Sequence, residues 1–69
     1  MPKSPRLTSK QVINQLKDAG FVEASQNGSH LKLFHPETRR TAIVPIHYGK
    51  IIPLGTLKSI EKQSNIKFF

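Results

Sequence analysis

The 69-residue sequence contains no cysteine and no tryptophan, and it has only four acidic residues. The absence of cysteine excludes disulfide bonds, thiolate-based zinc sites and a cysteine nucleophile. No apolar run approaches the roughly 18 residues of a membrane-spanning helix, and no hydrophobic stretch follows the basic N-terminus as a signal peptide requires. The composition therefore predicts a cytoplasmic protein with no membrane association.

Positive charge is what the sequence has in excess. Eleven Lys and Arg residues leave a formal net charge of +7, and the isoelectric point is about 10.3. On so small a body this charge favours polyanions, among which nucleic acids are the commonest partners. An acidic protein partner, or a basic surface that serves only solubility, stays open as an alternative. The length allows one small domain (residues 1–69), which buries only about 60% of its unfolded surface.

The first predicted element is a helix between Thr8 and Gly20. Thr8 and Gln11 have the spacing of a capping box, in which each side chain satisfies a backbone amide of the first helical turn. Gly20 is suited to the left-handed conformation that ends a helix. Residues 1–6 contain two prolines and two cations and are predicted to form a flexible basic arm. The inward face of the helix is expected to contain Val12, Ile13, Leu16 and Ala19.

A β-hairpin is predicted around Asn27-Gly28, the dipeptide most typical of a tight type I′ turn between two alternating runs. This turn fixes the register of the two strands. The predicted pairs are Ser25–His30, Ala24–Leu31, Glu23–Lys32, Val22–Leu33 and Phe21–Phe34. In this register Val22 and Ala24 face inward with Leu31 and Leu33, and Glu23 and Lys32 form an ion pair on the outer face. Phe21 turning under the first helix is the alternative to its pairing with Phe34.

A third strand over residues 40–46 and a second helix from about residue 55 to residue 64 complete the pattern. Pro45 is predicted to lie opposite His30, and a proline there indicates an edge strand. Inward positions are Ala42, Val44 and Ile46 in the strand and Leu57 and Ile60 in the helix. The fold class is therefore α+β, in the order α-β-β-β-α. Two helices cover one face of a three-stranded antiparallel sheet and leave the other face open.

His30 is the main candidate for chemistry, because its strand parity places it on the open face beside the hairpin turn. A histidine can exchange a proton near neutral pH, and removal of the ribose 2′-hydroxyl proton makes that oxygen a nucleophile toward its own phosphate. Lys32 lies on the same face and is expected to hold the phosphate. A merely solvent-exposed histidine is the alternative interpretation of His30.

The other two histidines are interpreted differently. His35 has inward parity at a strand end and is predicted to be structural. His47 follows Pro45 and is expected at the same end of the sheet as His30, so it either anchors a loop or shares acid–base duties with His30. No metal site or cofactor is predicted, because the carboxylates are dispersed and no histidine pair has ligand spacing.

Three further residues are candidates for nucleic-acid contact. Arg39 and Arg40 lie in the second turn, where they either contact phosphates or remain solvated. Phe34 on the open face either stacks on a base or belongs to a protein footprint.

The sequence closely resembles the HicA toxin family over residues 9–66. The segments that carry this resemblance are Gln26-Asn27-Gly28-Ser29-His30-Leu31-Lys32-Leu33, His35-Pro36, Arg39-Arg40, Pro45-Ile46-His47 and Gly55-Thr56-Leu57-Lys58-Ser59-Ile60. HicA proteins are small mRNA interferases of type II toxin–antitoxin systems with a fold like that of a double-stranded-RNA-binding domain (dsRBD).

The resemblance implies a catalytic role for His30, whose approach Gly28 and Ser29 would shape. It also implies neutralisation by an acidic HicB-type antitoxin that covers the active face. The expected function is an mRNA-cleaving endoribonuclease that arrests translation and growth. The rival is a noncatalytic RNA-binding module that keeps the fold and the charge. Phe68 and Phe69 have no place in the predicted packing.

Overall fold

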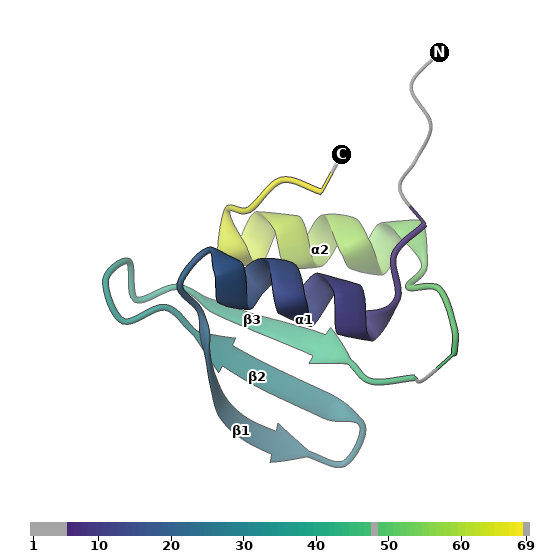
Figure 1. The fold of residues 1–69 in the computed structure, drawn as a ribbon, viewed down its shortest axis with the longest axis horizontal. Helices are drawn as coiled ribbons and strands as arrows, with labels where there is room; N and C mark the ends of the chain where they lie inside the picture. The colour runs from purple at the N-terminus through teal and green to yellow at the C-terminus, as the bar shows by residue number, and fades with distance from the viewer. Residues whose placement is uncertain (1–5, 48, 69) are drawn as a thin grey trace.

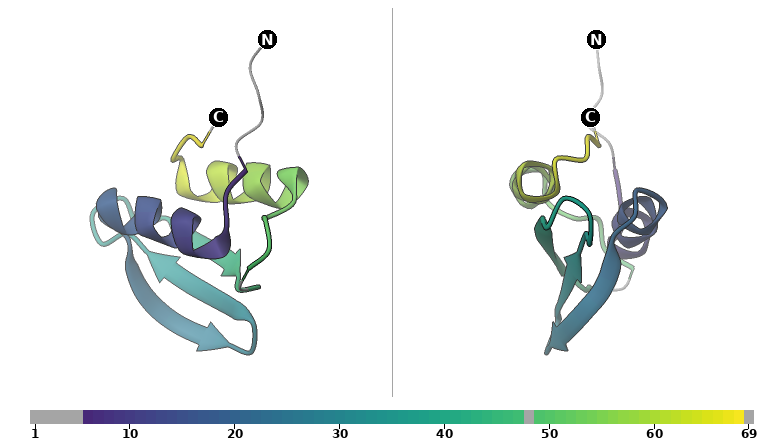
Figure 2. Two further views of the ribbon diagram at one scale, coloured as in Figure 1. Left: turned by 45° about the vertical axis from the view of Figure 1, so that its right-hand side comes forward. Right: turned by 90° about the vertical axis from the view of Figure 1, so that its left-hand side faces the viewer.

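The chain folds into one antiparallel sheet and two helices in the predicted order. The computed structural model describes residues 6–47 and 49–68, so most of the predicted basic arm, like Phe69, lies outside the described residues. The elements are α1 (Ser9–Asp18), β1 (Val22–Asn27), β2 (His30–Phe34), β3 (Thr41–Pro45) and α2 (Leu54–Ser64) (Figure 1). The sheet has the strand order β1-β2-β3, and Figure 2 shows both helices over the same side of it. The α+β prediction is confirmed.

The helix ends follow the local sequence signals. The Thr8 hydroxyl accepts a hydrogen bond from the Gln11 backbone amide at 3.3 Å, and the Gln11 side chain accepts one from the Thr8 amide at 2.9 Å. This capping box stabilises the helix by about 1 kcal/mol. Gly20, which was predicted to stop the first helix, has φ +108°, and Asn65 ends α2 in the left-handed conformation with φ +61°. Neither helix in the described part of the chain is long and apolar enough to cross a lipid bilayer.

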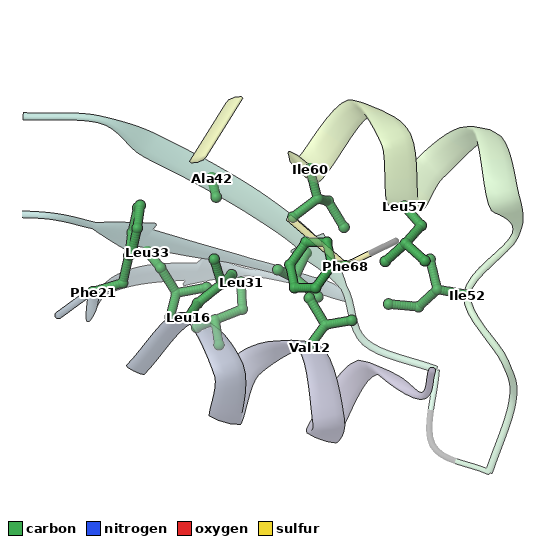
Figure 3. Close-up of a cluster of buried hydrophobic side chains, with 11 residues drawn as sticks. Val12, Leu16, Phe21, Leu31, Leu33, Ala42, Ile52, Leu57, Ile60 and Phe68 are labelled. Carbon is green, nitrogen blue, oxygen red and sulfur yellow. The ribbon is translucent and has the colours of Figure 1, made fainter. Parts of the chain in front are cut away.

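The core lies between the helices and one face of the sheet (Figure 3). Its sheet side is provided by β2 and β3, whose alternate residues are fully or almost fully buried, as predicted. Ile46 is only half-buried, at the margin of this core. The core residues are Val12, Leu16, Phe21, Leu31, Leu33, Ala42, Val44, Ile52, Leu57, Ile60 and Phe68.

The register of β2 against β3 is the predicted one, with His30 opposite Pro45. The register of β1 against β2 differs from the prediction. Asn27 pairs with His30, and an irregularity between Glu23 and Ser25 shifts the pairing by one residue along the strand. Every residue of β1 is exposed, with Val22 at 50%. The prediction that Val22 and Ala24 face the core is therefore wrong. In Figure 1, β1 is the edge of the sheet farthest from α2, and the helices do not cover it.

Two phenylalanines lie where the main sequence prediction did not put them. Phe21 is buried in the core instead of facing Phe34, so its alternative position beneath α1 is confirmed. Phe68 is also buried, and Figure 3 shows its ring between Val12 of α1 and Ile60 of α2. The tail is held there by the Phe68 amide, which donates to the Glu61 carboxylate at 2.7 Å. The C-terminal segment thus closes the seam between the helices.

The outer edge of β3 is closed by side chains from both helices. The Ser9 hydroxyl donates to the Pro45 carbonyl at 2.6 Å, and the Ile43 amide donates to the Gln63 side chain at 3.0 Å. Pro45 itself has no amide hydrogen to offer. These features block strand addition at the β3 edge of the sheet.

Candidate active site on the open sheet face

The hairpin turn sets the position of the candidate catalytic histidine. The two loop residues are Gly28 and Ser29, and only Gly28 has positive φ, at +62°. This is the pattern of a type II′ turn, which needs glycine at its first central position, and the predicted type I′ turn on Asn27-Gly28 is wrong. The Ile46 amide donates to the Ser29 carbonyl at 2.6 Å and fixes the turn to the end of β3.

His30 begins β2 directly after this turn and is exposed on the open face, as its parity predicted. Its imidazole forms no hydrogen bond with any residue that the structure describes. The ring lies in a hollow of about 370 Å³ whose other lining residues are Ser25, Asn27, Lys32 and Ile43. Both ring nitrogens are therefore available to a ligand that enters the hollow.

Lys32 lies two positions along the strand from His30, about 7 Å away, on the same face. The predicted Glu23–Lys32 ion pair is wrong, because the shifted register places Ser25 opposite Lys32. Glu23 instead forms an ion pair with Lys17 of α1. Among the described residues no carboxylate neutralises Lys32, so its ammonium group can bind an anion beside the imidazole.

Arg39 and Arg40 are not part of this hollow. They lie in the loop between β2 and β3, at the opposite end of β2 from His30, where Arg40 pairs with His35. Five residues of strand correspond to roughly 16 Å. Both arginines are exposed, so they can contact a polyanion only at a point distant from the histidine.

His35 is structural, as predicted. Its Nδ1 accepts hydrogen bonds from the Glu37 and Thr38 amides at 3.2 and 3.3 Å. The ring proton is therefore assigned to Nε2, which donates to the Ala19 carbonyl at 3.0 Å. The ring also packs edge-on against Phe21, with centroids 5.1 Å apart. His35 thus ties the end of α1 to the loop that carries the two arginines.

His47 lies at the same end of the sheet as His30, as predicted. It lies two positions after Pro45, the strand partner of His30, and its backbone amide donates to the Ser9 hydroxyl at 3.3 Å. Its exposed side chain forms no hydrogen bond within the described part of the chain. The backbone of His47 anchors a loop, and its imidazole is left without a structural task there.

Apolar side chains continue the open face beyond the hollow. Phe34 is half-buried and lies opposite Val22 in the register of β1 and β2. Val22 and Ile43 are about half exposed, so together with Phe34 they add apolar surface to this face. This strip next to His30 is suited to contact with a partner.

Asn27 and Ile43 line the hollow but were not named as site residues by the sequence analysis, which included Ser25 only as the predicted strand partner of His30. The predicted register paired Ser25 with His30 and left Asn27 inside the turn, whereas in the structure Ser25 lies opposite Lys32 and Asn27 lies opposite His30, a shift of two residues along β2. The available signal was the glycine itself. A single glycine followed by serine satisfies a type II′ turn on its own, whereas a type I′ turn also requires positive φ at Asn27.

Fold and site together define a class of small, strongly basic α+β domain whose open sheet face carries an exposed histidine and lysine. Residues 9–66 match the family model described as HicA toxin of bacterial toxin–antitoxin systems. Since the match covers most of the 69 residues, the chain belongs to the HicA toxin family. Membership gives it the toxin role in such a system and implies an antitoxin partner. No curated protein matched the chain.

Proposed function

We propose that this toxin is an endoribonuclease that cleaves mRNA, with His30 as its general base, and thereby arrests translation and growth. The observation that carries the proposal is the His30 imidazole, exposed in a hollow and without a hydrogen-bond partner among the described residues. The net charge of +7 supplies the attraction to the RNA backbone. A noncatalytic RNA-binding module would need the charge but not the free imidazole.

The proposed reaction is an intramolecular transesterification. His30 removes the proton of a ribose 2′-hydroxyl, and the 2′-oxygen forms a bond to the adjacent phosphorus. The bond from phosphorus to the 5′-oxygen of the next nucleotide breaks, and this oxygen receives a proton from the imidazolium or from water. The products are a 2′,3′-cyclic phosphate and a 5′-hydroxyl end. General acid–base help of this kind contributes about 10²- to 10⁴-fold in rate.

Lys32 is proposed to hold the scissile phosphate. Its ammonium group, about 7 Å along the strand from His30, favours the negative charge that develops on the phosphoryl oxygens. Ser29 and Gly28 shape the approach, because a tight turn without a bulky side chain keeps the hollow open at this end. Arg39 and Arg40 are assigned to phosphates farther along the same strand of RNA.

The antitoxin is proposed to be an acidic HicB-type protein that covers the open face. The half-exposed Val22 and Ile43, together with Phe34, provide the apolar contacts, and the cations provide complementary charge. Because the proposed substrate is mRNA, we place the protein in the cytoplasm. Binding of such a partner over the hollow would suppress cleavage by excluding RNA from His30.

The proposal is tested with purified wild type and His30→Ala on a defined mRNA. We expect His30→Ala to lower the cleavage rate about 10²- to 10⁴-fold, because the base is lost, and to leave RNA binding nearly unchanged. Cleavage is measured on gels, and the product ends are identified by mass spectrometry. The same pair of proteins, expressed in cells, should differ in growth arrest.

Lys32→Gln tests the proposed phosphate contact, and Lys62→Gln is its matched control. Lys32→Gln should weaken both binding and cleavage, whereas Lys62→Gln, an exposed change on α2 away from the hollow, should leave cleavage at the wild-type rate. RNA with 2′-O-methyl groups should resist cleavage. Equal cleavage by wild type and His30→Ala, or 3′-hydroxyl product ends, would contradict the proposed mechanism.

A further inference from the structure

A second hollow lies next to the candidate active site, at the end of the sheet. It has a volume of about 180 Å³. Its walls include Pro45, Ile51 and Pro53, and its polar groups include His47 and Lys50. This volume is below the range of about 300–1,000 Å³ typical of sites for drug-sized ligands, and it corresponds to a single small ring system.

The two hollows lie next to each other because residues of β3 line part of each: Ile43 lines the first and Pro45 lines the second. Pro45, which lines the second hollow, is the strand partner of His30, and the Ile46 amide binds the Ser29 carbonyl of the hairpin turn. Directly paired residues in an antiparallel sheet lie about 5 Å apart. The second hollow is therefore within reach of the next unit of a polymer whose backbone passes His30.

The loop that forms the second hollow is held on both sides. The His47 amide donates to Ser9, the Lys50 amide donates to the His47 carbonyl at 3.1 Å, and the Ile52 amide donates to the Leu7 carbonyl at 2.8 Å. The exposed imidazole of His47 and ammonium group of Lys50 are not used by these bonds. The hollow is thus built by backbone contacts, and its two polar side chains are left for a ligand.

We propose that this hollow binds the base of the nucleotide next to the scissile phosphate, a role that rests on the proposed function. The ring of His47 stacks on the base, the prolines and Ile51 provide apolar walls, and Lys50 contacts the phosphate of the same nucleotide. Flat heterocycles with an adjacent phosphate fit this combination of a ring, apolar walls and a cation. The hollow is then a specificity subsite, and His47 is a binding residue with no proton-transfer role.

The test is the affinity for a short RNA in which 2′-O-methyl groups prevent cleavage. His47→Ala should weaken binding about 5- to 10-fold, at the low end of base stacking because the hollow is open. His47→Phe keeps a ring and should restore most of the affinity. An RNA that lacks the base at the flanking position should bind His47→Ala and wild type equally. Lys62→Gln serves as the control for Lys50→Gln, which should reduce the salt slope by about 0.7.

Two outcomes overturn the subsite. One is unchanged affinity in His47→Ala, which together with a loss of turnover would make His47 an acid–base group. The other is an equal loss of affinity on the RNA without the base. The resonances of the His47 ring and of Ile51 in wild type provide a readout without mutation: they should shift with the intact RNA and clearly less with the RNA lacking the base, whereas Lys50, which contacts the phosphate, should shift with both. If no RNA is ever cleaved but this coupling is found, the proposed function fails and the base site stands.

Discussion

At the scale of single residues, the contact between His35 and Gly20 explains two positions that have no part in the proposed chemistry. A β-carbon added to Gly20 would lie 2.6 Å from Nε2 of His35, and Gly20 has φ +108°. The residue is therefore restricted both by the neighbouring ring and by its backbone conformation. Only glycine ends α1 and also admits the imidazole that holds the loop of residues 36–40.

A double-mutant cycle separates these two restrictions. Gly20→Ala in wild type should lower the free energy of unfolding by about 2–4 kcal/mol, through steric contact with the ring and an unfavourable φ. In the His35→Ala background the same change should cost about 1–2 kcal/mol, because only the backbone term remains. Urea unfolding of the four proteins measures both values. Additive costs would show that the ring does not contact Gly20.

At the scale of elements, the hairpin turn makes opposite demands on two neighbouring residues. Gly28 has φ +62° with open space around its α-carbon, so Gly28→Ala should cost about 1–2 kcal/mol through backbone strain alone. Asn27 is an extended strand residue paired with His30, so Asn27→Thr should change the free energy of unfolding by less than about 0.5 kcal/mol. A type I′ turn would instead make Asn27→Thr the more damaging change. Thermal or urea unfolding of the two variants decides between the turns.

Local signals made several elements predictable from the sequence. The capping box at Thr8, the positive φ at Gly20 and Asn65, and the β2–β3 register with Pro45 opposite His30 all depend on residues close in the chain or on strand parity. The exposure of His30 follows from the same parity, since Leu31 and Leu33 must face the core. The main feature of the candidate site was thus within reach of sequence reasoning.

The remaining features depend on packing that no local pattern contains. The apolar Val22 and Ala24 suggested that one face of β1 packs against the core. The helices do not cover that strand, and an irregularity between Glu23 and Ser25 interrupts the alternation of its side chains. Glu23 forms its ion pair with Lys17 of α1, and this contact can be predicted only when the position of the helix relative to the sheet is known. Phe68 enters the seam between the helices from the far end of the chain, so its burial follows only from the assembled fold.

At the scale of the whole molecule, the candidate RNA-contacting residues lie at the two ends of β2. His30 and Lys32 lie beside the hairpin turn, and Arg39 and Arg40 lie roughly 16 Å away at the opposite end of β2. One strand of RNA that follows β2 can contact both groups. Its affinity then depends on both groups of residues, whereas the rate of its cleavage depends only on the residues of the hollow.

This division predicts a specific salt dependence for the double variant Arg39→Gln/Arg40→Gln. Glutamine keeps a β-carbon at Arg39, whose φ is +62°, so the backbone cost is the same in both proteins. If each arginine contacts one phosphate, the slope of log affinity against log salt should become shallower by about 1.4. The cleavage rate at saturating RNA should stay at the wild-type value, because neither side chain reaches the scissile phosphate.

The slope is measured by fluorescence anisotropy between about 50 and 200 mM salt. With several phosphate contacts, the affinity should change about 10-fold or more over this interval. An unchanged slope would mean that the RNA leaves the sheet before this end, and a reduced saturated rate would place the arginines in the active site after all.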